Sequence, residues 1–218
     1  MKTNMILASV FPNHIMTCDT VSDNIKDQYL HQKEIKLTLN MSAKRKQSFT
    51  SGRLCARKAL NKLGIYNSPI LMSDDKSPIW PDNTIGCISH TKEFCGACAA
   101  YKSDFTSVGL DIERVKDIPL SLKYQICTPS EINKLKKITP DEQQKHLSLI
   151  FSAKETFYKY QYIITHQWVD FTDVTIALKN NKIFSVKLKK NIGHFLKGMT
   201  FSGNYFFYKD YIITGMCK

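Results

Sequence analysis

Two acidic residues lie close together near the middle of the chain, Asp111 and Glu113, with the apolar Ile112 between them. The segment Ser107–Glu113 that contains them is typical of a β-strand. Residues two apart on a strand point to the same face, so both carboxylates would project from one side while Ile112 turns into the core. Mg²⁺ binds a few carboxylate oxygens together with waters and substrate phosphates. On its own, however, such a pair is more often an ordinary solvated strand face.

A second group of ionisable residues lies in Phe151–Lys159, whose sequence is F-S-A-K-E-T-F-Y-K. Glu155 and Lys159 are separated by one helical turn, a spacing that places them on the same face of a helix. A third carboxylate and a cation would therefore be presented together. Taken alone, the spacing favours a plain surface ion pair, which contributes only about 0.3–0.5 kcal/mol to stability.

In combination, these two segments resemble the signature motifs of the 4′-phosphopantetheinyl transferases. The first motif corresponds to Val108–Glu113 and the second to Phe151–Lys159. Three upstream segments resemble further motifs in the family's order: the arginine-containing helix of the enterobactin-type members at Ser51–Leu60, their basic-x-P-x-W-P turn at Lys76–Pro81, and the Ser-His motif at Ile88–Thr91. With Arg45, the matches span residues 45 to 159, which is more than half of the chain.

The resemblance implies that the chain transfers the phosphopantetheine arm of coenzyme A to a serine of an apo acyl or peptidyl carrier protein, releasing 3′,5′-ADP. It also implies which residues bind the co-substrate coenzyme A. Arg45, Arg53, Lys76 and His90 would hold its 3′-phosphate ADP end, Ser89 and Thr91 would contribute donors nearby, and Lys154 and Lys159 would contact phosphate. Arginine suits this role because its guanidinium donates two parallel hydrogen bonds to a phosphate.

The resemblance further assigns the metal and the catalytic residues. Asp111, Glu113 and Glu155 would bind Mg²⁺ against the pyrophosphate of coenzyme A. Glu155 is the candidate base for the serine hydroxyl, directly or through a metal-bound water, and this role competes with its role as a metal ligand. Lys159 would stabilise or protonate the leaving 3′,5′-ADP. Asp111 counts as a catalytic residue through the metal.

The larger, surfactin-type members of this family fold as two similar α+β lobes related by pseudo-two-fold symmetry, with the active site between the lobes. A length of 218 residues fits that class better than the smaller trimeric one, so we expect a monomer. We expect an N-terminal lobe at residues 1–105 that contributes to nucleotide binding. The C-terminal lobe, residues 106–218, would carry the metal and catalytic motifs.

Local patterns predict the elements that would position these residues. Their mixed order of helices and antiparallel strands favours an α+β fold. The predicted elements are a strand at Asn4–Phe11, a helix at Ser42–Leu63 ended by Gly64, strands at 84–89 and 95–101, helices that begin with Thr-Pro-x-Glu capping boxes at Thr128 and Thr139, and hairpins over 171–188 and 205–214. The second of the two capped helices should include 151–160.

The helix at Ser42–Leu63 raises a question about charge. Arg45 projects onto the same helical stripe as apolar residues such as Phe49 and Leu60, and Arg53 lies at the edge of that stripe. A buried guanidinium is costly unless an anion pairs with it. Either the helix is broken near residues 50–52, or, if it is continuous, these arginines imply an anionic ligand.

Composition limits the partners. Lys and Arg number 31 against 19 Asp and Glu, a formal charge of +12, which attracts phosphates, nucleic acid or an acidic protein. Carrier proteins of this family are generally acidic, and no RNA-binding signature is present, so we expect an acidic carrier protein and no nucleic acid. Apolar runs are shorter than the roughly 20 residues of a membrane span. An odd set of seven cysteines fits a reducing compartment, and we expect a cytoplasmic enzyme.

Two alternatives stay open. A metal-dependent nuclease would also use acidic pairs and lysine on a basic protein. Cys87-x₂-His90-x₄-Cys95-x₂-Cys98 spaces four zinc ligands, although the apolar, strand-like surroundings favour small core residues. Among pathways, the enterobactin-type helix motif leans toward nonribosomal peptide synthesis of a siderophore, and polyketide and fatty-acid systems remain open.

Overall fold

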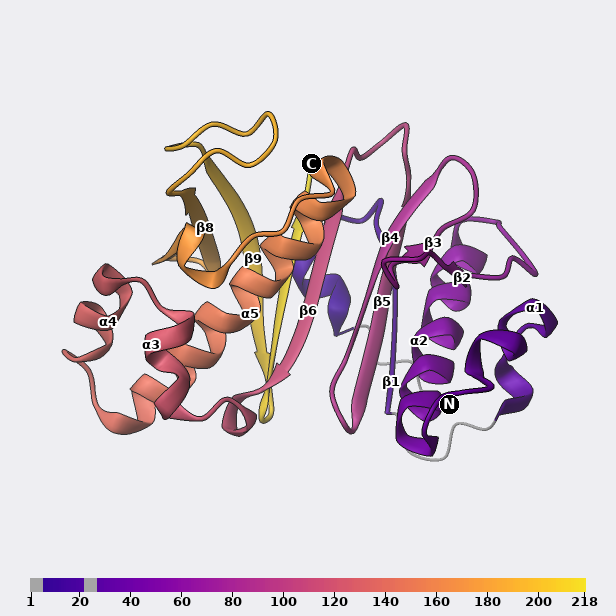
Figure 1. Cartoon of the computed structure of the whole chain (residues 1–218), viewed down its shortest axis with the longest axis horizontal. Helices are drawn as coiled ribbons and strands as arrows, with labels where there is room; N and C mark the ends of the chain where they lie inside the picture. The colour runs from indigo at the N-terminus through magenta and orange to yellow at the C-terminus, as the bar shows by residue number, and fades with distance from the viewer. Residues whose placement is uncertain (1–5, 22–26) are drawn as a thin grey trace. The chain divides into compact units, whose positions relative to one another are not determined.

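The computed structural model describes residues 6–21 and 27–218. The chain forms two compact units: the first extends to Val108 and includes Lys218, and the second comprises Gly109–Cys217. Each unit contains an antiparallel sheet and one long helix that lies along it (Figure 1). The prediction of an α+β fold is therefore confirmed. No helix in the described ranges is long and apolar enough to cross a membrane.

The first unit is built around a three-stranded sheet and helix α2. The sheet has the order β1-β5-β4, with β1 at Met16–Val21, β4 at Thr84–His90 and β5 at Phe94–Tyr101. Small side chains let α2, at Ala43–Lys62, pack closely on the sheet. The buried residues between them are Cys18, Cys55, Ala56, Ala59, Leu60, Ile70, Cys95, Ala97 and Ala99.

Shorter elements complete this unit. They are η1 at Leu7–Val10, η2 at Asp27–Tyr29, α1 at Gln32–Ile35, η3 at Lys36–Thr38, and the paired strands β2 at Leu71–Met72 and β3 at Pro78–Ile79. The strand expected at Asn4–Phe11 is wrong, because Leu7–Val10 form a 3₁₀ helix; Asn4 and Met5 lie outside the described residues. The first strand is β1, where buried polar residues such as Thr17 and Asp19 hide the alternation that marks a strand.

Helix α2 is continuous and has no break near residues 50–52, which was the second of the two possibilities raised by the sequence. Ser42 is its N-cap, and the Ser42 side chain accepts a hydrogen bond from the backbone N–H of Arg45 at 3.3 Å. Gly64 follows the helix with φ +82°, a left-handed conformation that glycine adopts without strain. The predicted helix and its glycine terminator are confirmed.

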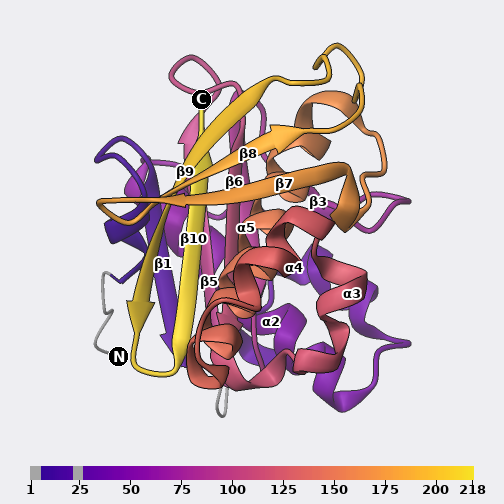
Figure 2. The same cartoon turned by 90° about the vertical axis from the view of Figure 1, so that its left-hand side faces the viewer.

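The second unit has a five-stranded sheet with the order β6-β10-β9-β8-β7 (Figure 2). The strands are β6 at Val108–Arg114, β7 at Val174–Lys179, β8 at Ile183–Leu188, β9 at Thr200–Tyr208 and β10 at Tyr211–Cys217. Both predicted hairpins are confirmed, since β7 pairs with β8 and β9 with β10. Helix α5, at Pro140–Thr165, packs on this sheet through residues such as Phe157 and Tyr160.

Both predicted capping boxes are present. Thr128 precedes α4 at Pro129–Leu135, and Thr139 precedes α5; each is bonded reciprocally with the glutamate three residues later. Pro at the first helical position in both cases lacks an N–H that the helix could not have used. The segment between β6 and these helices holds η4 at Val115–Asp117, η5 at Leu120–Leu122 and α3 at Lys123–Ile126; η6 at Phe171–Asp173 precedes β7.

The two units share one topology that the sequence does not reveal as a repeat. In each unit the first strand pairs with the last strand, and the last strand pairs with the one before it, giving β1-β5-β4 and β6-β10-β9. In each, the long helix lies in the sequence after the first strand and before the final pair of strands. The second unit adds β7 and β8 beyond β9.

Candidate active site

Strand β6 and helix α5 meet at an ion pair between two predicted site residues. The ammonium nitrogen of Lys159 lies 2.7 Å from Oδ1 of Asp111 and also donates to the carbonyl oxygen of Leu110 at 3.2 Å. The Asp111 side chain is 3% exposed, whereas the Lys159 side chain is 26% exposed. The cation therefore lies at the rim of the site and can face a bound molecule while it contacts the carboxylate.

A glycine allows these two elements to come so close. A Cβ atom on Gly109 would lie 2.9 Å from the Cβ of Tyr160, and even nearer to the helix backbone. Gly109 precedes Asp111 by two residues, so any larger residue there would push α5 away from the carboxylates of β6. The sequence pattern contained this glycine, but the close approach becomes visible only in the fold.

The three predicted carboxylates affect one another electrostatically. Burial raises the pKa of Glu113 to about 8, the charge of Asp111 and then that of Glu155 add to this effect, and Lys159 opposes it. Burial also raises the pKa of Glu155, with Lys159 opposing and Asp111 adding. We call Asp111, Glu113 and Glu155 the carboxylate cluster. Its second and third negative charges are unfavourable unless a cation compensates them.

The oxygen ligands of the carboxylate cluster are of the type that binds Mg²⁺. No three His, Cys, Asp or Glu side chains within residues 6–21 and 27–218 are already grouped closely enough to enclose a metal ion. Mg²⁺ does not need such a cage, because it is usually held by one or two carboxylates together with waters and substrate phosphates. The carboxylate oxygens of the cluster are hard donors of the kind that Mg²⁺ prefers. A bound divalent cation would in turn favour the ionised form of Glu113 and Glu155, which burial disfavours.

Lys154 does not lie where the resemblance placed it. Its ammonium group donates to Oε2 of Glu131 at 2.7 Å and to the carbonyl oxygens of Ile126 and Phe171, both at 2.8 Å. The Lys154 side chain is 1% exposed. All three of its N–H donors are used inside the unit, so the predicted phosphate contact of Lys154 is wrong. Glu131, which the sequence indicated only as part of a capping box, is its partner.

Arg53 is buried in the first unit, where backbone carbonyls and the nearby charge of Glu34 compensate its guanidinium. Its Nε donates to the carbonyl oxygen of Ile70 at 2.7 Å and one terminal nitrogen donates to that of Leu71 at 3.2 Å, while the guanidinium lies over the ring of Phe49. Burial lowers the pKa of Arg53 to about 10. Burial of Arg53 is therefore compensated inside the protein and is not by itself evidence for an anionic ligand, and Arg45 is exposed on α2.

The Ser-His motif forms the last two residues of β4, and Thr91 begins the turn to β5. Ser89 is buried and His90 is exposed. The hydroxyl oxygen of Thr91 accepts from the backbone N–H groups of Phe94 and Glu93 at 3.0 and 3.3 Å, which fixes the turn. Thr91 thus has a structural role beside the one that the resemblance implied.

Lys76 lies in the turn between β2 and β3. It is exposed and has φ +68°. The turn is held by a hydrogen bond between the Ser73 hydroxyl and the Asp75 carboxylate, which also accepts from the backbone N–H of Ser77 at 2.9 Å.

The structure brings Asp111, Glu113, Glu155 and Lys159 together in the second unit. It places Arg45, Arg53, Lys76, Ser89, His90 and Thr91 in the first unit.

The four residues with zinc-like spacing cannot converge on one ion. In the β4–β5 ladder Cys87 is opposite Cys98, and His90 is opposite Cys95. Opposed residues share a face of the sheet, whereas positions three apart on one strand point to opposite faces. The two pairs therefore lie on opposite faces, and the interpretation of the cysteines as small core residues is confirmed.

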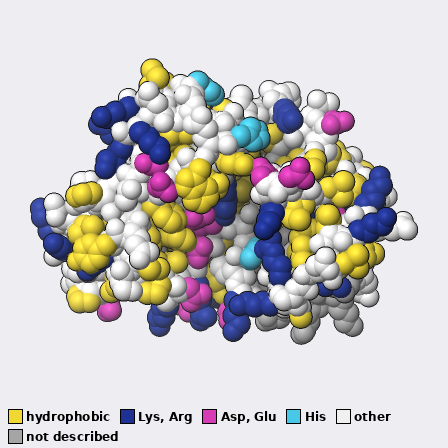
Figure 3. All heavy atoms as spheres, in the orientation of Figure 1, with side chains coloured by type: hydrophobic (Ala, Val, Ile, Leu, Met, Phe, Trp, Pro, Cys, Tyr) yellow, Lys and Arg dark blue, Asp and Glu magenta, His cyan; other side chains and the backbone are white. Residues whose placement is uncertain are grey.

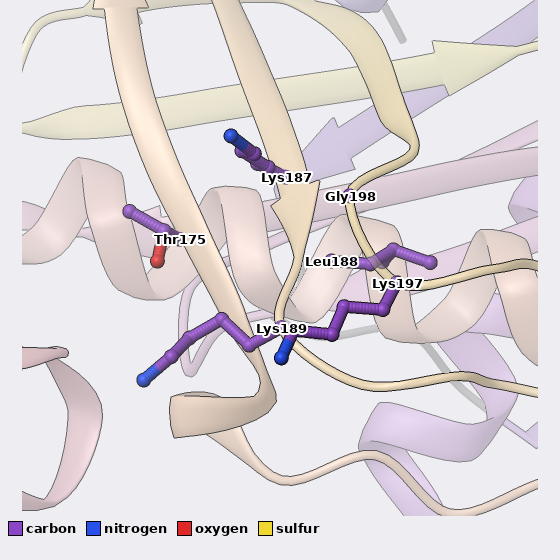
Figure 4. A pocket seen from close by; sticks show the side chains of 6 residues that line it. All are labelled: Thr175, Lys187, Leu188, Lys189, Lys197 and Gly198. Carbon is purple, nitrogen blue, oxygen red and sulfur yellow. The ribbon is translucent and has the colours of Figure 1, made fainter.

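A pocket of about 540 Å³ lies elsewhere in the second unit, lined by Thr175, Lys187, Leu188, Lys189, Lys197 and Gly198 (Figure 4). Its three lysine side chains extend in different directions and do not converge on one point. None of these six described lining residues has a carboxylate, and we do not assign the pocket to the reaction.

Two family models match the chain. The 4′-phosphopantetheinyl transferase N-terminal domain matches residues 33–100, and the 4′-phosphopantetheinyl transferase superfamily matches residues 107–214. The second match contains the carboxylate cluster and Lys159.

Several curated proteins are similar. The 4′-phosphopantetheinyl transferase Svp of Streptomyces mobaraensis is 30% identical over 79% of this chain and 72% of its own length. PptT of Mycobacterium tuberculosis, with the same activity in its name, is 32% identical over 68% of this chain and 65% of its own. Enterobactin synthase component D of Salmonella typhimurium is 32% identical over 53% of this chain and 48% of its own. Among solved structures, holo-[acyl-carrier-protein] synthase of Thermotoga maritima matches 52% of this chain and 62% of its own with 19% identity and a TM-score of 0.40.

Proposed function

Because the chain belongs to the 4′-phosphopantetheinyl transferase superfamily, we propose that it transfers the 4′-phosphopantetheine arm of coenzyme A to a serine of an apo acyl or peptidyl carrier protein. The observation that carries this proposal is the junction of β6 and α5, where Lys159 contacts Asp111 beside Glu113 and Glu155. Basic and acidic groups at one site suit the transfer of a phosphoryl group from a pyrophosphate to a hydroxyl, in which negative charge is stabilised and a proton is moved.

Asp111, Glu113 and Glu155 are the residues that would hold Mg²⁺. When bound, the ion would neutralise the pyrophosphate of coenzyme A and orient it for in-line attack. The raised pKa values of Glu113 and Glu155 support this assignment, because burial and then the neighbouring carboxylates disfavour their negative charges, and a bound cation would compensate those charges.

In the reaction, the serine oxygen of the carrier protein attacks the β-phosphorus of coenzyme A, and the bond from that phosphorus to the bridging oxygen breaks. We propose Glu155 as the base that accepts the serine proton, directly or through a water, a role that competes with metal binding by the same carboxylate. We propose that Lys159 stabilises the negative charge that develops on the leaving 3′,5′-ADP, and the partial exposure of its ammonium group supports this role. No covalent enzyme intermediate is required.

For the nucleotide of coenzyme A, we propose the cationic and polar residues of the first unit. They are Arg45, Arg53, Lys76, Ser89, His90 and Thr91. The exposure of Arg45, Lys76 and His90 supports this role, since each can reach a ligand in solvent. Lys154 is not included, because its ammonium group is already occupied.

For the protein substrate, we propose an acidic carrier protein. The net charge of +12 supports this choice, and Lys and Arg side chains are spread over the face shown in Figure 3. Such a field raises the rate of encounter with an acidic partner. The similarity to enterobactin synthase component D favours a carrier protein of nonribosomal siderophore synthesis. Seven free cysteines suit a reducing compartment such as the cytoplasm.

The proposal is tested by incubating the protein with an apo carrier protein, coenzyme A and Mg²⁺, and measuring the mass of the carrier. The expected result is a mass gain equal to the phosphopantetheine arm, which Asp111→Ala and Glu155→Ala abolish while both variants keep the wild-type circular dichroism spectrum. Asp141→Ala, an exposed acidic residue at the start of α5, is the matched control and should retain activity. Full activity in Asp111→Ala or Glu155→Ala would contradict the site. Release of nucleotides from DNA or RNA would instead support a nuclease.

A further inference from the structure

A buried ion pair connects α5 to the elements that surround it. The side chains of Lys154 and Glu131 are each 1% exposed, and their charged atoms are 2.7 Å apart. Besides Glu131, Lys154 contacts the carbonyl oxygens of Ile126 at the end of α3 and of Phe171 in η6. Lys154 therefore joins three segments that are distant in sequence.

Glu131 connects this group to one further element, strand β7. Its Oε2 accepts hydrogen bonds from the backbone N–H and the hydroxyl of Thr128 at 2.6 and 2.9 Å, and its Oε1 accepts from the backbone N–H of Ile176 in β7 at 2.6 Å. Buried charges are tolerated when they are paired and fully hydrogen-bonded, and the removal of one partner leaves an uncompensated charge. The pair thus fixes α5 relative to α3, α4, η6 and β7.

This fixed point lies directly beside a residue of the carboxylate cluster. Lys154 precedes Glu155, and successive residues of a helix point about 100° apart. With Lys154 held in the core, the rotation and axial position of α5 are set, and so is the direction in which Glu155 points. On the other side, Lys159 contacts Asp111 one turn later.

The first unit contains the same device. Glu34, at the corresponding position of the α1 capping box, is fully buried and paired with Arg57 on α2. Its Oε1 accepts from the backbone N–H of Ile70 at 2.9 Å, as Glu131 accepts from that of Ile176. The residue after Arg57 is Lys58, whereas the residue after Lys154 is Glu155. The buried ion pair is therefore part of the fold of both units, and in the second unit the residue that follows it is a carboxylate of the cluster.

We propose that Lys154, together with Glu131, is a positioning residue that orients Glu155 for metal binding and proton transfer, and that it makes no contact with coenzyme A. This inference rests on the proposed transferase function. It separates the roles of two adjacent residues of one motif: Lys154 acts through the fold, and Glu155 acts on the reacting groups.

The test compares Lys154→Met, Glu131→Gln and the double variant Lys154→Met/Glu131→Gln. A misplacement of about 1 Å can cost about 100-fold in rate, so we expect kcat to fall at least about tenfold in Lys154→Met. The Mg²⁺ concentration for half-maximal rate should rise, and the KM for coenzyme A should stay within about twofold of wild type. A phosphate contact predicts the reverse, a raised KM with kcat little changed, and this result would overturn the proposal.

The double variant keeps the test valid if a single variant unfolds. It buries no unpaired charge, so its stability should be closer to that of wild type. Its kcat should nevertheless remain low, because the bonds to Ile126 and Phe171 are lost. Recovery of both stability and kcat in the double variant would show that the pair acts on folding alone, contrary to the proposal.

Arg57→Met is the matched control in the first unit. It should lower the melting temperature as Lys154→Met does, yet leave the Mg²⁺ midpoint unchanged. An equal shift of that midpoint in Arg57→Met would contradict the proposal. Binding of Mn²⁺ to the protein without coenzyme A, measured by electron paramagnetic resonance, provides a readout independent of transfer: Lys154→Met should weaken it and Arg57→Met should not. If wild type binds Mn²⁺ in this way but modifies no carrier protein, the transferase function fails while the positioning role stands.

Discussion

A Cβ atom on Gly109 would lie 2.3 Å from the carbonyl oxygen of Thr156. The backbone of α5 therefore rests directly on β6, between the positions of Glu155 and Lys159. No residue other than glycine fits there without moving the helix, so this contact sets the separation between the two elements that carry the carboxylate cluster.

We predict that Gly109→Ala lowers both stability and activity. The added methyl group meets backbone atoms, which cannot move aside as a flexible side chain can, and overpacking of this kind costs about 1–3 kcal/mol. Displacement of α5 should reduce kcat at least about tenfold. Denaturant unfolding and carrier-protein modification measure the two effects.

Gly64→Ala is the control for this prediction. Nothing in the described part of the chain lies within 4 Å of a Cβ at Gly64, although φ is +82°. Its cost is backbone strain of about 1 kcal/mol, with no displacement of α5. Comparable losses of kcat in the two variants would show that activity follows stability rather than the β6–α5 separation.

Binding of Mg²⁺ should strengthen as the pH rises from 6 to 8. The pKa of Glu113 is raised to about 8 in the folded protein, so Glu113 binds a proton over a range in which the unfolded chain does not. The stability of the metal-free protein should therefore fall as the pH rises from the ordinary pKa of glutamate toward 8. Protons compete with the metal for the carboxylate, so the rise in melting temperature produced by Mg²⁺ should be larger at pH 8 than at pH 6.

Glu113→Gln should weaken this pH dependence, and Asp141→Asn should leave it unchanged. An identical Mg²⁺-induced shift at pH 6 and pH 8 in wild type would separate Glu113 from the metal.

A second pH effect should arise in the first unit, at Asp19. This side chain is 3% exposed, its Oδ1 has no hydrogen-bond partner among the described residues, and burial raises its pKa to about 6. Because the folded state holds the proton more tightly, the stability contribution is full below pH 4 and is lost as the pH rises to about 6. The loss amounts to at most about 3 kcal/mol.

Urea unfolding of Asp19→Asn measures this effect. Relative to wild type, the variant should gain stability between pH 4 and pH 6, since the amide does not ionise. If the difference between the two proteins is constant over that window, Asp19 is not the group that titrates.

The exposed cations of the first unit should discriminate coenzyme A from dephospho-coenzyme A, which lacks the 3′-phosphate. A charge-assisted hydrogen bond contributes about 1.5–3 kcal/mol, so Arg45→Ala or Lys76→Ala should raise the KM for coenzyme A about tenfold. The KM for dephospho-coenzyme A should change little. Lys44→Ala, an exposed neighbour of Arg45 on α2, is the control and should affect neither. Equal effects on both substrates would place these cations elsewhere than at the 3′-phosphate.

The sequence predicted the elements whose ends carry explicit signals, such as the capping boxes at Thr128 and Thr139 and the glycine after α2. It also predicted that the residues of β6 and α5 belong to one site, since the motif pattern names Asp111, Glu113, Glu155 and Lys159 together. The sequence did not predict which face of α5 packs into the core.

Lys154 illustrates this limit. It is adjacent to Glu155, and only the rotation of the helix decides that one faces the core and the other faces the carboxylates. Its partner Glu131 lies 23 residues earlier, on the preceding helix α4. A capping-box glutamate that also binds a buried lysine has no signal of its own in sequence. Strand β1 was missed for a related reason, because its buried Asp19 looks like a surface residue.

The position of β10 has a consequence for the order in which the second unit can assemble. β10 is the last strand of that unit in sequence, yet it lies between β6 and β9 and is the strand that pairs with β6. While the chain is being synthesised, β6 therefore remains an unpaired edge until β10 has left the ribosome. Closing so long a loop makes this step slow compared with the local hairpins. Loss of β10 would separate β6 from the rest of the sheet and leave β9 as a new unpaired edge, so an early stop in translation should leave an aggregation-prone chain rather than a weakened enzyme.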